Sequence, residues 1–241
     1  MYFSRTTLLY MLVFTLLLHK VVGDDPLYHF CTSSENYAAN GPFNTNLKHL
    51  MDFLFISVPP FGFGFWSVGI GETRVNGLAL CRGDVSSTDC KSCVVEANSM
   101  IRQRCPYKKG AIIWYDHCLL KYSKEEFFGK IDNKNKFYMW NVRSVYDRVS
   151  FNQKTKKLIS RLSNEANYSP LLYATGELEV DDSRTLYGLV QCTRDLPFFD
   201  CKKCLDTATS ELPRCCDGRE GGRVIGGSCN FRYELYPFVN A

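Results

Sequence analysis

The stretch GLALCRGDVSSTDCKSC, residues 77–93, returns in altered form as GLVQCTRDLPFFDCKKC at residues 188–204. Both versions space their cysteines as Cys-x8-Cys-x2-Cys, and they lie 111 residues apart in a chain of 241. Several coincidences at one fixed offset indicate an internal duplication. The same offset carries five cysteines of the first half onto five of the second, namely Cys81, Cys90, Cys93, Cys105 and Cys118 onto Cys192, Cys201, Cys204, Cys216 and Cys229.

Each copy has the periodicities of a mixed helix and strand unit. Leu47, Leu50 and Leu54 recur at helical spacing, which predicts an amphipathic first helix. Ser87 and Thr88 can cap a second helix. Alternating apolar residues, as in 111–115 and 230–235, predict strands of a half-buried sheet. The expected fold class is α+β, with two tandem disulfide-framed domains, each a five-stranded antiparallel sheet packed by two helices.

The predicted division of the chain follows the repeat. Residues 1–23 are expected to form a signal peptide, residues 24–128 the first domain and residues 138–241 the second. The polar stretch between them, residues 129–137, has little to bury and is expected to be a linker. A mature chain of this length admits two domains of about 100 residues each.

The first residues have the features of a secretory leader. Arg5 precedes an apolar run over residues 8–18, and Gly23 stands just before two aspartates. The run is too short for a spanning helix, which needs about 20 residues, and no later run of that kind follows. We therefore expect a secreted, extracellular product without a membrane anchor.

The charge pattern argues against a nucleic-acid partner. The formal net charge is +4, and the leader holds two of the positive charges, Arg5 and Lys20, and no acid. Lys154, Lys156 and Lys157 form the densest basic cluster, which is typical of a solvated helix face.

The repeated CxxC motif, at residues 90–93 and 201–204, allows three chemistries. In an oxidising secretory route such cysteines form disulfides, each worth roughly 2–4 kcal/mol. A zinc site needs four ligands held together, and His29 and His117 have no counterparts in the second copy, so we expect no metal or other cofactor. A thioredoxin-like role needs a low-pKa thiol at a helix start, and the repeated spacing to a third cysteine argues against it.

The pattern Cys-x8-Cys-x2-Cys resembles that of the Gnk2-homologous domain, also called the domain of unknown function 26. The surrounding sequence is similar to that of plant cysteine-rich repeat secretory proteins over nearly all of the mature chain. This similarity is carried by residues 77–85, 113–118, 216–224 and 232–238. The resemblance implies an apoplastic location.

The family's disulfide pattern implies three bridges in the first copy and two in the second. The second copy departs from the pattern, because Trp140 stands where a counterpart of Cys31 is expected and Cys215 appears beside Cys216. Either Cys215 and Cys216 form a vicinal bridge, which we favour, or one of them pairs outside its domain. The implied pairs are Cys31–Cys105, Cys81–Cys90, Cys93–Cys118, Cys192–Cys201 and Cys204–Cys229.

The resemblance also implies a sugar site, because a ginkgo seed lectin of this family is similar to a mannose binder that uses an Asn, an Arg and a Glu. At the matching positions the second copy has Asn141, Arg223 and Glu234. Arg donors, a Glu acceptor and an amide can together satisfy adjacent sugar hydroxyls. Alternatively, Arg223 and Glu234 are a structural ion pair on neighbouring strands. The first copy has lost the pattern, with Thr32, Ile112 and Ser123 at these positions.

Two further segments bear on function. Residues 53–66 pack phenylalanines and a tryptophan around prolines and glycines. These side chains either belong to the core or form an exposed apolar patch of the kind that marks a protein partner. Asn167, followed by Tyr168 and Ser169, begins a glycosylation sequon in a predicted loop.

The preferred interpretation is a secreted binding protein in extracellular recognition or defence, whose second domain binds a mannose-type carbohydrate. No Ser, His and Asp set recurs at a useful spacing, so we expect no enzyme activity. One alternative is a protein–protein interaction module for receptor ectodomains. A second is an extracellular thiol redox sensor, which needs free thiols.

Overall fold

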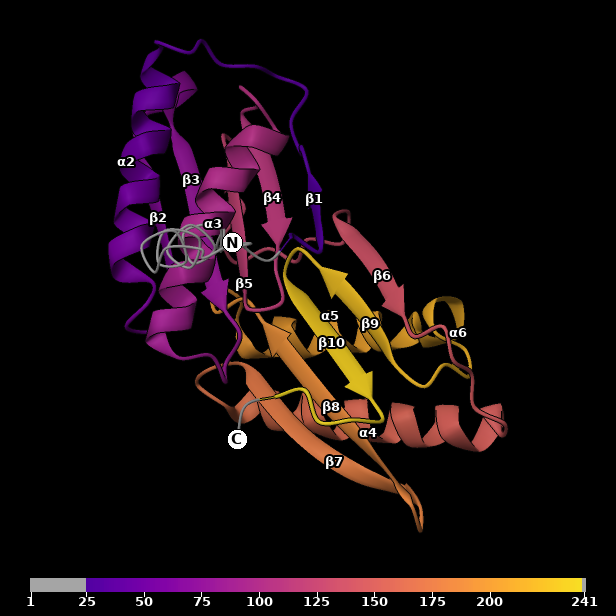
Figure 1. The fold of residues 1–241 in the computed structure, drawn as a ribbon. Helices are drawn as coiled ribbons and strands as arrows, with labels where there is room; N and C mark the ends of the chain where they lie inside the picture. Colours follow the sequence, from indigo (N-terminus) through magenta and orange to yellow (C-terminus); the bar gives the residue numbers. More distant parts are fainter. Residues whose placement is uncertain (1–24, 240–241) are drawn as a thin grey trace, which may run out of the picture.

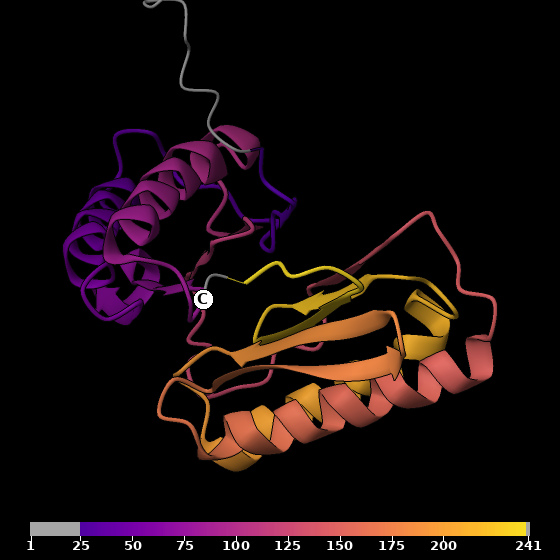
Figure 2. The same ribbon diagram turned by 60° about the horizontal axis from the view of Figure 1, so that its bottom comes forward.

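The computed structural model describes residues 25–239, so the predicted signal peptide lies outside the described residues. Within this range the chain forms two five-stranded antiparallel sheets, each with helices on one face (Figures 1 and 2). The expected α+β class, with two tandem five-stranded units, is confirmed. Among the residues described, no helix is long and apolar enough to cross a membrane.

The first sheet has the strand order β1-β4-β5-β3-β2, with α2 and α3 packed against one face (Figure 1). Helix α2 begins at Pro42, where the missing amide N–H costs no hydrogen bond. Helix α3 is capped by Ser86, one residue before the predicted caps, and the Ser86 hydroxyl accepts from the Asp89 amide. The elements are β1 (Tyr28–Phe30), α2 (Pro42–Ser57), β2 (Phe63–Val68), the 3-10 turn η1 (Gly71–Thr73), β3 (Val75–Cys81), α3 (Ser87–Arg104), β4 (Gly110–Trp114) and β5 (Cys118–Ser123).

The second sheet repeats this order as β6-β9-β10-β8-β7, with α4 and α5 along its lower face in Figure 2. Helix α4 is capped by Asp147, whose side chain accepts from the Ser150 amide. The elements are β6 (Lys136–Trp140), α4 (Arg148–Tyr168), β7 (Tyr173–Asp181), β8 (Arg184–Cys192), α5 (Phe198–Ser210), α6 (Leu212–Cys215), β9 (Gly222–Gly226) and β10 (Cys229–Glu234).

All twelve cysteines lie in disulfides. Two kinds of disulfide occur in both domains. One joins the end of β3 or β8 to the helix that follows it, and the other joins that helix to the start of β5 or β10. The six bridges are Cys31–Cys105, Cys81–Cys90, Cys93–Cys118, Cys192–Cys201, Cys204–Cys229 and Cys215–Cys216.

The second domain holds its first strand without the counterpart of the Cys31–Cys105 bridge. By strand register, Trp140 occupies the place that Cys31 has in the first domain. Instead, Lys136 Nζ of β6 pairs with Glu211 Oε1 at 2.5 Å, and the Tyr138 hydroxyl donates to Glu211 Oε2 at 3.1 Å. These polar contacts tie β6 to the end of α5 where the first domain uses a covalent bond.

The outer face of the first sheet is apolar and is covered by the linker and the second domain. The Trp114 indole N–H donates to the Gly226 carbonyl at 3.1 Å, and the Gln191 amide donates to the Cys81 carbonyl at 3.0 Å. The buried cluster comprises Leu78, Leu80, Ile112, Trp114 and Leu119 of the first sheet with Ile225 of the second, packed by Leu27, Phe30, Phe63, Phe127, Phe128 and Phe137.

Equivalent positions of the two copies meet at this boundary. The rings of Tyr28 and Phe137, which hold matching register positions on β1 and β6, stack with centroids 5.1 Å apart. Trp114 and Ile225, separated by the repeat offset, belong to the same buried cluster. At these two places, therefore, matching residues of the two copies lie next to each other across the domain boundary.

The segment between the domains is docked, although a stretch with little to bury was expected. Strand β6 begins at Lys136, inside the predicted linker. The Asp132 carboxylate lies 2.6 Å from Lys121 Nζ, and both side chains are nearly buried, at 11 % and 8 % exposed. The Asp132 amide also donates to the Ser228 hydroxyl at 2.9 Å. One acid thus joins the first sheet, the linker and the second sheet.

Removing this acid should destabilise the protein more than breaking a surface pair does. We expect Asp132→Ala to lower the free energy of unfolding by about 3–5 kcal/mol, because Lys121 would stay buried without a partner. Arg184→Ala, which breaks an exposed hairpin pair with Asp181, should cost at most about 1 kcal/mol. Urea unfolding of both variants measures the difference, and equal costs would contradict the role of Asp132.

The same pair should make stability depend on pH. Burial acts to raise the pKa of Asp132, but the charge and hydrogen bond of Lys121, together with hydrogen bonds from Asn135, outweigh it and hold that pKa below its ordinary value. The stabilisation is therefore complete above about pH 4, the unfolded-state value, and is lost as the pH falls through the folded-state pKa. In urea titrations from pH 6 to 2, Asp132→Asn should show a shallower loss of stability than the wild-type protein.

Candidate functional site

A pocket of about 260 Å³ opens near the first domain, where β6 and β10 end and β9 begins. It combines polar side chains with two aromatic residues. The lining residues are Leu27, Asp116, Met139, Trp140, Asn141, Gly222, Arg223, Arg232, Glu234 and Tyr236.

The three residues of the expected sugar site all line this pocket, and each comes from a different segment. Asn141 follows β6 directly, and its backbone N–H donates to the Gly221 carbonyl at 2.9 Å. Arg223 lies on β9, and Glu234 ends β10. The Glu234 carboxylate lies against Gly221, where an added Cβ would come within 1.8 Å of Oε2. A side chain at residue 221 would therefore displace Glu234 from the pocket.

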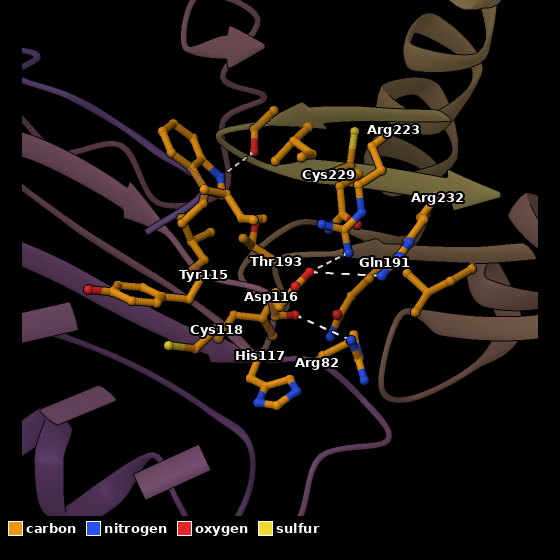
Figure 3. Close-up of a pocket in the computed structure, with 18 of the residues that line it drawn as sticks. Arg82, Tyr115, Asp116, His117, Cys118, Gln191, Thr193, Arg223, Cys229 and Arg232 are labelled. Carbon is orange, nitrogen blue, oxygen red and sulfur yellow. Dashed lines mark hydrogen bonds and ion pairs between the residues drawn. The ribbon is translucent and has the colours of Figure 1, made fainter. Parts of the chain in front are cut away.

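The expected ion pair between Arg223 and Glu234 is not the one that forms. Arg223 Nη2 lies 2.5 Å from Asp116 Oδ1 of the first domain, whereas Glu234 Oε1 accepts from Arg232 Nε at 3.1 Å. Figure 3 shows the Asp116 carboxylate joined by dashed lines to the guanidinium groups of both Arg223 and Arg232. The alternative interpretation, in which Arg223 and Glu234 pair with each other, was therefore wrong, because each of them pairs with another residue.

The sequence interpretation missed two residues of the site, Asp116 and Arg232. Arg232 could have been found from the sequence, because it stands two residues before Glu234 on the same strand and therefore lies on the same face of the sheet. Asp116 carried no such signal, because it belongs to the turn after β4 and reaches Arg223 only through the packing of the two domains.

The charges of this cluster influence one another. Partial burial acts to raise the pKa of Asp116, but the charge and hydrogen bond of Arg223, with the charges of Arg232 and Arg82, hold it below its ordinary value. Burial lowers the pKa of Arg223, and the charge of Arg232 lowers it further. A guanidinium stays protonated despite such shifts, so the site holds fixed charges at physiological pH.

In the first domain the matching positions serve the domain contact. Ile112, the counterpart of Arg223, is fully buried in the cluster between the domains. Lys121, the counterpart of Arg232, is paired with Asp132 of the linker. The outer face of the first sheet is thus used for packing, while the corresponding corner of the second remains open as a pocket.

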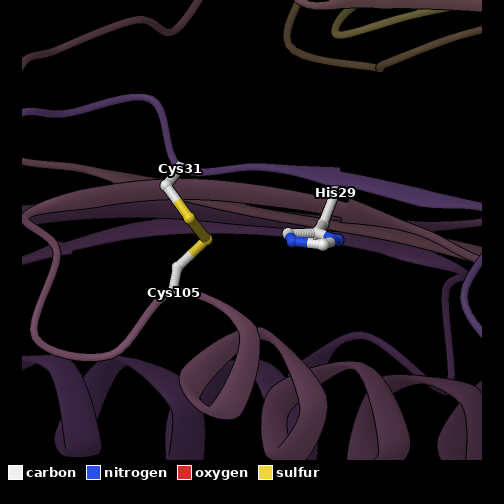
Figure 4. Close-up of side chains that lie close together, drawn as sticks. All are labelled: His29, Cys31 and Cys105. Carbon is white, nitrogen blue, oxygen red and sulfur yellow. A yellow bond between two sulfur atoms is a disulfide. The ribbon is translucent and has the colours of Figure 1, made fainter.

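A second cluster, at the end of β1, groups three side chains that ligate metals in other proteins. His29, Cys31 and Cys105 hold potential ligand atoms within 4.8 Å of one another. Figure 4 shows that the two sulfurs are bonded to each other. A cysteine binds metal as a thiolate, so this cluster offers only the imidazole. Burial lowers the pKa of His29, and the charge of Arg104 adds to that effect.

The phenylalanine-rich segment divides between core and surface. Leu54 and Val58 are buried. Trp66 is 52 % exposed and stacks on Phe53 with ring centroids 4.7 Å apart. Further exposed apolar side chains nearby in sequence are Ile56, Phe61, Phe65 and Ile70.

Asn167, the residue of the glycosylation sequon, lies in the last turn of α4 and not in a loop. Its side-chain oxygen is buried. The residue before it, Ala166, is fully buried in the core of the second domain.

Comparison with known proteins matches the chain to the salt stress response/antifungal family twice, over residues 30–125 and 140–236. It is 64 % identical over 230 residues to an antimicrobial ginkbilobin-2-like protein of Castanea crenata, covering 95 % of each chain. It is 51 % identical to cysteine-rich repeat secretory protein 38 of Arabidopsis thaliana, over 88 % of this chain and 85 % of the relative.

The fold is similar to a solved tandem structure. The chain superimposes on the tandem DUF26 ectodomain of the Arabidopsis thaliana cysteine-rich receptor-like protein PDLP8 with a TM-score of 0.79 and 27 % identity, covering 88 % of this chain and 98 % of the other. The doubled family match, the secretory relatives and the shared tandem fold agree with the resemblance found in the sequence. The chain therefore belongs to the salt stress response/antifungal family, as a secreted cysteine-rich repeat protein with two tandem DUF26 domains.

Proposed function

We propose that this secreted protein acts in extracellular recognition or defence, as a non-enzymatic binding protein that takes a mannose-type glycan in the pocket of its second domain. One observation supports the proposal above the others: Asn141, Arg223 and Glu234 line a single pocket of about 260 Å³. The relative from Castanea crenata, named as antimicrobial, supports a role in defence.

The chemistry of the pocket suits a sugar. Hexose hydroxyls both donate and accept hydrogen bonds, so they need donors and acceptors side by side. Arg223 supplies N–H donors, Glu234 supplies an acceptor, and Asn141 can supply either. The exposed side chains of Trp140 and Tyr236 at the pocket offer aromatic surface of the kind that packs against the C–H face of a pyranose ring.

Arg223 should be needed for binding. We expect Arg223→Ala to weaken the affinity for methyl α-mannoside at least about tenfold, since hydrogen bonds to a charged group are worth about 1.5–3 kcal/mol. Arg223→Lys should also bind weakly, because lysine lacks the fork of donors. Isothermal titration calorimetry measures the affinity, and Arg184→Ala on the distant exposed hairpin is the control. Unchanged binding by Arg223→Ala would remove the glycan proposal.

A second candidate function, engagement of receptor ectodomains, is favoured by the exposed aromatic pair of Phe53 and Trp66. Strand β2, which carries Trp66, is an edge strand of the first sheet and has no charged residue between Phe63 and Val68. Unprotected sheet edges with apolar side chains are suited to pairing with another chain. The similarity to a receptor-like ectodomain supports partners of that class.

The aromatic pair offers a direct test of this second function. We expect the double variant Phe53→Ser and Trp66→Ser to lose binding to tandem DUF26 receptor ectodomains in biolayer interferometry while keeping glycan affinity. Tyr168→Ser, which removes an exposed aromatic residue of α4, is the matched control. Equal binding by the double variant and the wild-type protein would eliminate the edge as the contact.

A further inference from the structure

Two nearly buried arginines face each other across strands β9 and β10. Arg223 and Arg232 are register partners, and their side chains are only 12 % and 15 % exposed. Like charges directly opposite on neighbouring strands repel each other, and burial strengthens the repulsion because less water screens it. This arrangement therefore depends on acidic partners.

The two balancing carboxylates come from different domains. Glu234 of the second domain accepts from Arg232 Nε at 3.1 Å. Asp116 of the first domain lies 2.5 Å from Arg223 Nη2 and 3.9 Å from Arg232 Nη1 (Figure 3). Asp116 thus forms ion pairs with both guanidinium groups, while Glu234 pairs with Arg232 and acts on Arg223 only through its charge.

A neighbouring cation, Arg82, acts on the charge of this acid but forms no ion pair with its carboxylate. The Arg82 guanidinium reaches only the backbone carbonyl of Asp116, at 3.5 Å. Its own charge is balanced by Asp84, which accepts from Nε at 2.6 Å and from Nη2 at 2.8 Å. The Asp116 carboxylate is therefore directed to the second domain.

The second domain has no acid of its own at the position that matches Asp116. The repeat offset places Gly227 there, and an added Cβ at that residue would come within 2.3 Å of Asp132 Oδ2. A second domain without the first would keep Arg223 and Arg232 side by side, with Glu234 as the remaining acid. The charge balance of the pocket is therefore a property of both domains together.

We propose that Asp116 is a positioning residue of the glycan pocket, which holds Arg223 from across the domain boundary and makes the pocket a two-domain, charge-balanced site for a neutral pyranose. This inference rests on the proposed function and adds a positioning residue from the first domain and a selectivity for neutral over anionic sugars. Leu27, another residue of the first domain, lines the same pocket. The Asp116 side chain is 47 % exposed, and Arg223 has five N–H donors, so donors remain for a ligand.

The balance of charge sets the selectivity. Two guanidinium groups and two carboxylates leave no net charge, so a neutral hexose gains hydrogen bonds without meeting an unpaired charge. An anionic sugar would meet the carboxylates of Asp116 and Glu234 as well as the guanidinium groups, so it would gain no net attraction from the pocket's charge. Without the charge of Asp116 the pocket becomes positive and attracts anions.

Asp116→Asn in the full mature protein tests this inference, with methyl α-mannoside and a short oligogalacturonate as the neutral and anionic probes in calorimetry. We expect mannoside affinity to fall about tenfold, and the ratio of mannoside to oligogalacturonate affinity to fall at least as much. Asp116→Glu, which keeps the charge, should restore the ratio. Trp114→Phe removes the interdomain hydrogen bond to Gly226 but no charge, so its ratio should match that of the wild-type protein.

Any of four outcomes would overturn the inference. The first is an unchanged ratio of mannoside to oligogalacturonate affinity in Asp116→Asn. The second is an equal shift of that ratio in Trp114→Phe, which would show that Asp116 is only a structural contact. Loss of mannoside binding in Arg223→Ala without any effect in Asp116→Asn would overturn the two-domain site and leave the proposed function standing. Failure of the wild-type protein to bind any neutral glycan would remove both.

Discussion

The apolar outer face of the first sheet is the feature on which the arrangement of the whole chain depends. Leu78, Ile112 and Trp114 would be left in water if the first domain stood alone, and fully burying one large apolar side chain contributes about 1.5–3 kcal/mol. Covering them docks the linker and the second sheet against the first. That docking brings Asp116 to Arg223, so the electrostatics of the candidate pocket follow from apolar burial beside it.

The fold could be predicted from the sequence because the signals that specify it are local and occur twice. The spacing of Leu47, Leu50 and Leu54 predicted the buried face of α2, and the doubled cysteine pattern predicted the tandem architecture. Boundaries were less accurate, because caps and helix ends depend on small differences between neighbouring residues. The cap of α3 is Ser86 where Ser87 and Thr88 were expected, and α4 continues through Asn167 where a loop was expected.

The candidate site was only half accessible to such reasoning. Residues that alternate on one strand, as Arg232 and Glu234 do, follow from periodicity. A contact such as Arg223 with Asp116 joins positions that no repeat or pattern relates, and it exists only because the two domains pack in one particular way. Asp132 shows the same limit. Its polar segment is typical of a solvated linker, and the sequence does not reveal that Lys121 is buried and pairs with an acid in that segment.

The joining of two packed copies in one chain has a consequence for how the protein can change. In a dimer of identical subunits, every substitution appears in both, so a surface needed for association cannot also be altered to bind a ligand on one side only. Joining the copies in one chain removes that restriction. The matching positions of Ile112 and Arg223 show the result. The first copy keeps an apolar residue in the contact between the domains, while the second has a charged residue in the candidate pocket.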